Sequence, residues 1–107
     1  MPGPVTMLVT YRPKPGKEKE FLPLLDRHWP TLDRAGLVSK EPPKFFRSLD
    51  KRTGRVAYIE IFQWKDEKAS DVAHETPEVM SIWEPMGAVL EDLSLQEVES
   101  VKPPFGG

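Results

Sequence analysis

Two kinds of residue spacing alternate along this chain, and their order constrains its fold more than any other feature. Alternation at every second residue, which is typical of strands, is found in VTMLVTYR (5–12), KFFRSL (44–49), RVAYIEIFQW (55–64) and LSLQEVESV (93–101). Spacing by three and four, which is typical of amphipathic helices, is found over 16–35 and from 66 to about 90. The resulting order, β-α-β-β-α-β, predicts a ferredoxin-like plait, an α+β fold with both helices on one face of a four-stranded antiparallel sheet.

The prolines divide the helical regions. Pro23 and Pro30 each remove a backbone donor from the first region, and they lie on the same side of the helix. This predicts either one helix bent twice in the same direction or two shorter helices. In the second region, Asp66 is the expected N-cap of a short helix that ends near residue 75. Thr76 followed by Pro77 then begins another helix, because threonine is a good N-cap and proline suits the first helical position.

Length and charge narrow the function classes. A chain of 107 residues predicts a single domain over 1–107, with 102–107 as a flexible tail. Fifteen basic and 17 acidic residues give a net charge of −2, which argues against nucleic-acid binding. The absence of cysteine excludes disulfides, thiolate catalysis and cysteine-ligated metals. No apolar run approaches the ~20 residues of a membrane span and the start lacks a signal-peptide pattern, so a cytoplasmic protein without membrane contact is expected.

A plait leaves one face of its sheet without helices. Residues such as Met7, Val9, Tyr58 and Ile59 would make an uncovered face an exposed apolar patch of the kind that marks an interface. We therefore expect a homodimer that pairs sheet face against sheet face.

One long segment, YIEIFQWKDEKASDVAHETPEVMSIWEPM (58–86), resembles the antibiotic-biosynthesis-monooxygenase-like group of the dimeric α/β-barrel superfamily. GKEKEFLPLLDRHWPTL (16–32) is similar to the first helix of that group. The resemblance implies a dimeric α/β barrel with a pocket between sheet and helices in each subunit. It also implies cofactor-free oxygenation of polycyclic phenols or, in another branch, haem degradation. That branch uses an asparagine on the first strand and a tryptophan where this chain has Asp71, and the chain contains no asparagine, so haem degradation is disfavoured.

His74 is the first catalytic candidate. A histidine on a helix below a tryptophan-bearing strand can act as general base on a phenol, because its ordinary pKa lies near neutral pH. The alternative is a structural role, in which His74 bonds to Glu75, to Glu78 or to a backbone carbonyl. Tyr11, on the first strand, is expected to orient the substrate.

Glu60 is the second catalytic candidate, as an orienting group. It stands in the middle of a strand on an otherwise apolar face, where an unpaired carboxylate is costly. Two alternatives follow: a polar group facing the pocket, or an ion pair between strands with Arg47 or Lys44.

Aromatic side chains supply the expected substrate-binding residues. Trp64 and Trp83 are the predicted stacking walls, and Tyr58 shares a strand face with Trp64. His28 falls on the apolar stripe of the first helix, where it either lines the pocket or is a hydrogen-bonded core residue. Trp29 is expected to cover part of the pocket mouth. The alternative for Trp83 is a purely packing role on its helix.

Other chemistries lack their motifs. Two histidines without ligand spacing predict no metal site, and neither a phosphate-binding loop nor a nucleophile elbow is present. The leading hypothesis is a cofactor-independent monooxygenase acting on a small hydrophobic, aromatic or polycyclic phenolic ligand. The alternative is a non-enzymatic ligand-binding or stress-related dimer. A third hypothesis is an isomerase or decarboxylase acting on a small acidic lactone.

Overall fold

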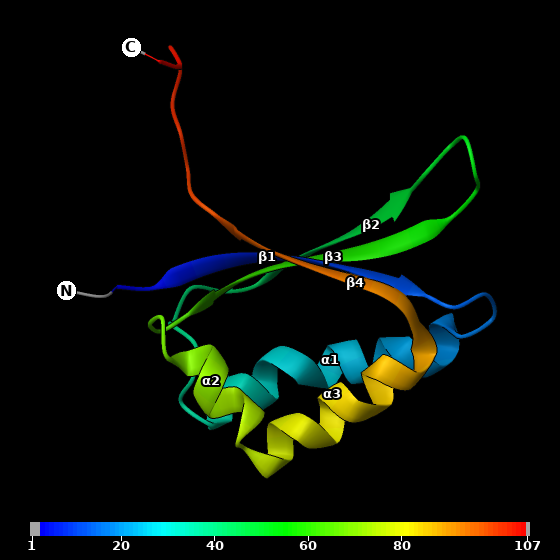
Figure 1. Ribbon diagram of the computed structural model, residues 1–107, viewed down its shortest axis with the longest axis horizontal. Helices are drawn as coiled ribbons and strands as arrows, with labels where there is room; N and C mark the ends of the chain where they lie inside the picture. Colours follow the sequence, from blue (N-terminus) through cyan, green and yellow to red (C-terminus); the bar gives the residue numbers. More distant parts are fainter. Residues whose placement is uncertain (1–2, 107) are drawn as a thin grey trace.

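The predicted element order is confirmed by a computed structural model of the protein, which describes residues 3–106. The strands are β1 (Val5–Pro13), β2 (Lys44–Leu49), β3 (Val56–Trp64) and β4 (Leu90–Val98), and the helices are α1 (Glu18–Arg34), α2 (Ala69–His74) and α3 (Pro77–Val89). The strands form one antiparallel sheet in the order β2-β3-β1-β4. All three helices lie on the same side of that sheet (Figure 1). The chain is therefore an α+β ferredoxin-like plait.

The central strands β1 and β3 place alternate residues on the two faces of the sheet. Val9 pairs with Glu60 and Tyr11 with Tyr58, so these residues share the face that the helices cover. Thr10 pairs with Ile59 on the opposite face. The alternation predicted which residues share a face. Of the residues expected on the uncovered face, however, only Ile59 lies there, because Met7, Val9 and Tyr58 lie on the face that the helices cover.

Helix α1 is continuous through both of its prolines, so the prediction of a single helix is the correct alternative. Pro23 and Pro30 are exposed, while the opposite side of the helix is buried against the sheet. The core combines this side with the inner faces of β1, β3 and α3. Its main members are Val9, Tyr11, Phe21, Leu25, Leu32, Phe62, Trp64, Val79, Ile82 and Met86.

Predicted boundaries were wrong at the start of α2 and at both ends of β4, which ends at Val98 and not at residue 101. Asp66 is not the N-cap of α2: its carboxylate accepts the Lys68 backbone N–H at 2.9 Å in a turn, and the helix begins at Ala69 with Lys68 as its N-cap residue. Strand β4 begins at Leu90, before the predicted start at residue 93, because the chain turns from helix to extended backbone directly at that residue. Thr76 and Pro77 do begin α3, although the Thr76 hydroxyl donates to Val72 O instead of capping the helix.

The molecule is flat, with principal extents of 43 × 40 × 19 Å, and its radius of gyration is 15.0 Å. A compact domain of this length has a radius of gyration of about 13 Å. Two segments account for the extension: the β2–β3 hairpin and the residues after β4 both rise from the side of the sheet opposite the helices (Figure 1). No helix among residues 3–106 is long and apolar enough to span a membrane. Residue 107, at the end of the predicted tail, lies outside the described residues.

Candidate functional site

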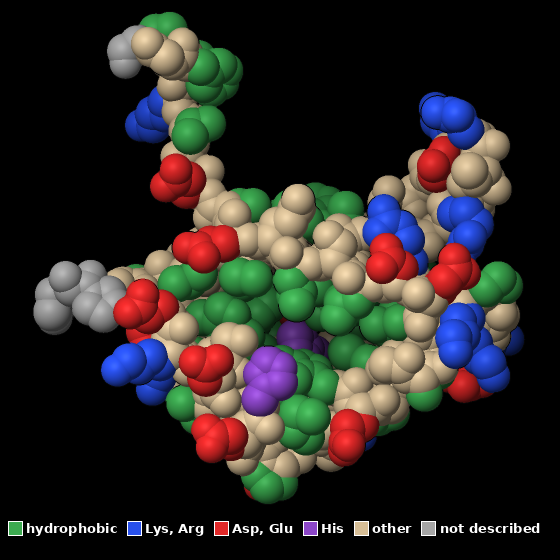
Figure 2. All heavy atoms as spheres, in the orientation of Figure 1, with side chains coloured by type: hydrophobic (Ala, Val, Ile, Leu, Met, Phe, Trp, Pro, Cys, Tyr) green, Lys and Arg blue, Asp and Glu red, His purple; other side chains and the backbone are tan. Residues whose placement is uncertain are grey.

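A cavity of about 450 Å³ lies between the sheet and the helices α2 and α3. Figure 2 looks onto it: hydrophobic side chains surround a hollow below the sheet, with histidine side chains at its floor and its rim. Its polar lining comes from Tyr11, His28, Ser70 and His74 and, on β4, from the acidic residues Glu91 and Asp92. The remaining lining is mostly apolar: Met7, Val9, Phe62, Trp64, Trp83, Met86, Leu90, Leu93 and Leu95. A pocket of this size with few polar groups is suited to a small aromatic or hydrophobic ligand.

Glu60 lies directly behind this cavity, at the centre of a hydrogen-bond network. Its side chain is 0% exposed, and its Oε1 accepts the Tyr11 hydroxyl at 2.6 Å. The Nδ1 atom of His28 lies 3.0 Å from Oε1 and 3.2 Å from Oε2. The predicted ion pair with Arg47 or Lys44 was wrong: both side chains lie on the exposed edge strand β2, and the partners of Glu60 come from β1 and α1.

The network continues through His28 to the cavity wall. The indole Nε1 of Trp83 donates to His28 Nε2 at 2.8 Å. An indole N–H can only donate, so His28 Nε2 must be the unprotonated nitrogen of a neutral imidazole. The proton is then on Nδ1, which donates to Glu60. The partners therefore assign one tautomer to His28, with its Nε2 lone pair accepting the Trp83 N–H at the cavity wall.

The electrostatics of the network follow from this assignment. Glu60 receives two donors, Tyr11 O–H and His28 Nδ1–H, which is the pattern of an ionised carboxylate. Burial, together with the charge of Glu60 and the hydrogen bond to it, raises the pKa of the Tyr11 phenol well above its ordinary value. Tyr11 thus stays protonated. The Glu60 carboxylate thus has two buried donors, Tyr11 and His28.

His74 lies at the rim of the cavity and is exposed. Its Nδ1 is 2.8 Å from the backbone carbonyl of Ser70, one turn earlier in α2, and its ring packs edge-on against Trp83 at 4.8 Å between centroids. No carboxylate among the described residues bonds to it. His74 and Glu60 therefore do not meet: they lie at opposite ends of the chain of groups formed by His28 and Trp83.

Trp64 and Trp83 both line the cavity, and their stacking against a substrate stays a prediction. Trp64 is buried and packs edge-on against Phe62, while Trp83 is half-buried. Trp29 and Tyr58 are not part of this cavity, so the expectation that Trp29 covers its mouth was wrong. These two residues line a second hollow, of about 480 Å³, between α1 and the outer edge of β2.

The pairing of His28 with Glu60 is the feature that the sequence reading missed. Each residue was recognised as a polar group on an apolar face, His28 on a helical stripe and Glu60 on a strand. Buried polar side chains almost always have a hydrogen-bond partner. Because both residues were expected to be buried in one small core, the sequence could have predicted that they bond to each other. For a metal, no group of three or more candidate ligands is found among residues 3–106.

Comparison with known proteins identifies the fold. No family profile matches the sequence, and neither does any curated protein. Among solved structures, a protein described as an antibiotic biosynthesis monooxygenase matches with a TM-score of 0.69 and 18% identity, over 92% of this chain and 99% of that one. SnoaB, a cofactor-independent oxygenase from Streptomyces nogalater, matches with a TM-score of 0.66 and 17% identity, over 94% of this chain and 98% of that one. Rv0793 from Mycobacterium tuberculosis matches with a TM-score of 0.61 and 17% sequence identity, over 94% of this chain and 98% of that one.

These structures share their architecture with this chain over nearly its whole length. It has the fold of the solved structure described as an antibiotic biosynthesis monooxygenase and of SnoaB. At such identities, the likeness concerns the fold alone, and a function has to be argued from the site.

Proposed function

We propose that this protein is a cofactor-independent monooxygenase that oxidises a small aromatic or polycyclic phenol and works as a homodimer. The observation that carries the proposal is the Glu60–His28 pair, whose unprotonated nitrogen, His28 Nε2, lies at the wall of an aromatic-lined cavity and accepts the Trp83 indole N–H. A carboxylate that orients a histidine by holding its Nδ1–H is the usual arrangement of an activated general base. The oxygenase activity of SnoaB, a structure with the same fold, points in the same direction.

In the proposed reaction, the phenol hydroxyl takes the place of the Trp83 N–H at His28 Nε2 and gives its proton to that atom. The resulting anion is electron-rich and transfers one electron to molecular oxygen, after which the radical pair joins in a carbon–oxygen bond. The imidazolium returns its proton to the peroxide. The attacked carbon, a CH group in the anion, now carries the hydroperoxide. Loss of its remaining proton with cleavage of the O–O bond converts this carbon to a carbonyl, so that one oxygen atom enters the product and the other leaves as water.

The remaining groups have supporting roles in this proposal. Glu60 stabilises the imidazolium that forms on His28, and Tyr11 holds Glu60 in place through its short hydrogen bond. Trp64 and Trp83 stack against the substrate. His74 is assigned to the cavity rim, because its Nδ1 is engaged with a backbone carbonyl and no carboxylate orients it.

A homodimer through the sheet faces is part of the proposal. The chain exposes 7420 Å², whereas a compact monomer of 12.2 kDa exposes about 6,100 Å². A standard interface buries about 800 Å² per partner, which is less than this excess. The face without helices carries Leu8, Ile59 and Ile61, which are only half-buried, and the exposed Phe46, so it is an apolar surface that a second copy would cover.

Oxygen consumption tests the proposal. Wild-type protein and the variants His28→Gln and His74→Ala are mixed with anthrone, a polycyclic substrate whose enol form is a phenol, in an oxygen-electrode chamber. Loss of a general base lowers a rate by about 10²- to 10⁴-fold, so His28→Gln should lose at least about a hundredfold of kcat/KM. His74→Ala, the matched histidine control, should lose less than tenfold. Retained activity in His28→Gln would remove the proposed base.

One observation favours a second candidate function, ligand binding without chemistry. Both nitrogens of His28 and both oxygens of Glu60 have partners within the protein, as in a purely structural network. A binding protein would bind anthrone with Trp fluorescence quenching but consume no oxygen. The same experiment, with binding measured in parallel, separates the two functions.

A further inference from the structure

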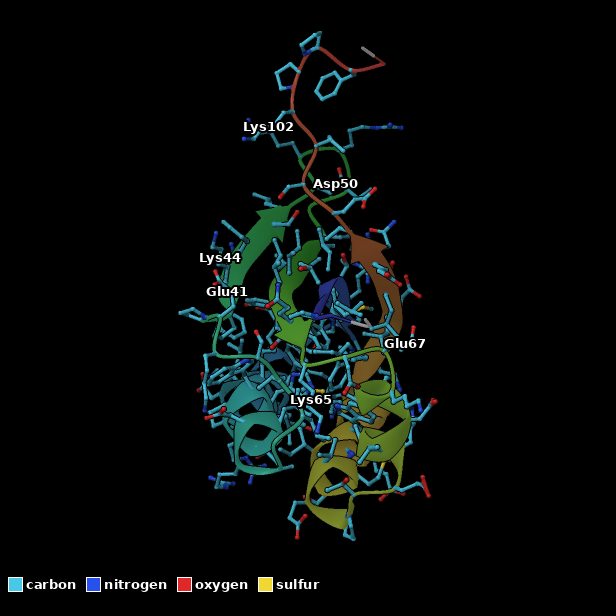
Figure 3. The ribbon with its side chains drawn as sticks, turned by 90° about the vertical axis from the view of Figure 1, so that its left-hand side faces the viewer. Glu41, Lys44, Asp50, Lys65, Glu67 and Lys102 are labelled. Atoms are coloured by element: carbon cyan, nitrogen blue, oxygen red, sulfur yellow. The ribbon has the colours of Figure 1, made fainter. Side chains whose placement is uncertain are left out.

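Trp83 connects the two histidines of the cavity. It lies on α3, whereas His28 lies on α1 and His74 on α2; Figure 3 shows α1 beneath the β2 side of the sheet and the other two helices beneath the β4 side. The indole Nε1 donates to His28 Nε2 at 2.8 Å, and the same indole packs edge-on against the His74 ring at 4.8 Å between centroids. The Trp83 side chain therefore stands between the buried end of the cavity and its rim.

The Trp83 indole covers the nitrogen that a ligand would have to reach. A neutral imidazole has one lone pair in its ring plane, and the Trp83 N–H occupies it at His28 Nε2. His28 is 3% exposed, so the indole also separates this nitrogen from bulk water. A ligand hydroxyl can bond to Nε2 only after the indole has moved. Trp83 therefore controls access to the atom that acts as the base in the proposed function.

The surroundings of Trp83 leave the indole room to move. Trp64, the other tryptophan of the cavity, is 6% exposed and belongs to the core, whereas Trp83 is half-buried and packs against the core from outside. Gly87 follows Trp83 by one turn of α3 and lines the same cavity, and a methyl group at this glycine would meet no atom within 4 Å. The bond to His28 is a single hydrogen bond, which a ligand that donates an equivalent bond can replace.

We propose that Trp83 is the gate of the cavity: its indole covers His28 Nε2, and a ligand opens the gate by donating its own hydroxyl to that nitrogen. This inference rests on the proposed function, because it takes His28 Nε2 as the atom that the phenol reaches. It adds a rule of specificity to that function. A ligand with a hydroxyl group exchanges one hydrogen bond for another at Nε2, whereas a ligand without a donor leaves the indole in place.

The gate also limits the shape of the ligand. The hydroxyl must enter first, because His28 lies at the buried end of the cavity and Trp83 extends towards the rim. The indole, once moved aside, lies against the face of the ligand, and Phe62 and Trp64 form the opposite wall. The ligand class is therefore a flat, fused-ring phenol whose hydroxyl is at the leading end of the ring system. A bulky group beside the hydroxyl would meet the indole first.

A matched pair of ligands tests the gate. 2-Naphthol and 2-methoxynaphthalene share their ring system, but only the naphthol can donate a hydrogen bond. Both dissociation constants are measured by isothermal titration calorimetry under nitrogen, so that no oxygenation takes place. The Kd of the ether divided by the Kd of the naphthol defines the hydroxyl preference. Because both ligands stack alike, this ratio cancels changes in stacking that a substitution causes.

We expect Trp83→Phe to raise the hydroxyl preference about five- to tenfold, because the naphthol no longer has to replace a hydrogen bond within the protein to reach Nε2. Trp64→Phe is the matched control. It makes the same substitution at the cavity tryptophan that packs against Phe62, and it should leave the hydroxyl preference unchanged. An unchanged preference in Trp83→Phe, or an equal rise in both variants, would overturn the gate.

A second measurement uses the wild-type protein and so does not depend on the folding of a variant. The indole N–H signal of Trp83, assigned through its contacts with the His74 ring, is followed in ¹H–¹⁵N correlation spectra. 2-Naphthol should move this signal upfield, since the indole loses its bond to His28. 2-Methoxynaphthalene produces the same ring-current shifts and should leave that bond intact. Equal shifts with the two ligands would contradict the gate.

The outcomes separate the gate from the proposed function. Release of the Trp83 N–H by 2-naphthol, in a protein that consumes no oxygen with anthrone, would support the gate and contradict the monooxygenase. Oxygen consumption that depends on His28, together with a hydroxyl preference that Trp83→Phe does not change, would overturn the gate alone.

Discussion

The tyrosines at positions 11 and 58 offer a matched test of the buried network. They are direct cross-strand partners in β1 and β3, and each donates its hydroxyl to a glutamate, Tyr11 to Glu60 at 2.6 Å and Tyr58 to Glu18 at 2.7 Å. The two bonds are alike in length but differ in surroundings. Tyr11 and Glu60 are buried, whereas Tyr58 and Glu18 are partly exposed to solvent. Replacing each tyrosine by phenylalanine therefore compares the same bond in two environments.

We expect Tyr11→Phe to lower the free energy of unfolding by about 3 kcal/mol. A hydrogen bond to a charged acceptor contributes about 1.5–3 kcal/mol, and its loss here leaves a buried carboxylate with His28 as its single donor. Tyr58→Phe should cost less than about 1 kcal/mol, because water replaces the lost donor at an exposed carboxylate.

Urea denaturation followed by tryptophan fluorescence measures both values. For an m-value of about 1.5 kcal/mol/M, a loss of 3 kcal/mol lowers the midpoint by about 2 M. All variants are compared at one protomer concentration, since the unfolding of a dimer depends on it. If Tyr11→Phe costs no more than Tyr58→Phe, Glu60 is not a buried charged acceptor and the network loses its electrostatic basis.

Three further outcomes follow from the same contacts. The raised pKa of Tyr11 means that above pH ~10 the unfolded chain releases a proton that the folded chain keeps, so stability should fall with pH by up to about 1.4 kcal/mol per unit in urea titrations. Tyr11→Phe should reduce this fall, and an unchanged slope would contradict the assignment. Trp83→Phe removes the donor at His28 Nε2, so in a His74→Ala background diethylpyrocarbonate should modify the remaining histidine about tenfold faster, the equivalent of one hydrogen bond. Equal modification rates would mean that Trp83 does not shield that nitrogen. His74→Ala alone should change the free energy of unfolding by less than about 0.5 kcal/mol, as for an exposed residue; a larger loss in thermal or urea unfolding would show a structural role.

The fold could be predicted because the residue spacing along each segment agrees with the secondary structure that the segment has in the folded protein. The alternation in β1 and β3 and the apolar stripes of α1 and α3 each predicted the element and the face that is buried. The errors fell at boundaries. Aspartate is common at helix N-termini, but the Asp66 carboxylate accepts the Lys68 backbone N–H in a turn before the helix. The start of β4 at Leu90 depends on its pairing with Pro13, a residue far away in the sequence, so local spacing could not predict it.

The sequence predicted which residues belong to the site, but it did not predict which of them are hydrogen-bonded to one another. His28, Glu60, Tyr11 and Trp83 were all candidates, but the bonds that join them link residues between 32 and 55 positions apart. Such bonds depend on how a helix is rotated above a strand, which spacing along the chain does not specify. His74 ranked first because it lies in the segment that best marks the fold, whereas its helix directs it to the rim of the cavity.

The tautomer of His28 is the most direct test of the account, because the proposed base requires an unprotonated Nε2. Long-range ¹H–¹⁵N correlation spectra of imidazole side chains distinguish the two ring nitrogens, and the chain has only two histidines to resolve. The His74→Ala variant assigns the remaining signals to His28. At neutral pH, the network predicts a protonated Nδ1 and an unprotonated Nε2 in His28. A proton on Nε2, alone or together with one on Nδ1, would contradict the hydrogen bond from Trp83 and remove the proposed base.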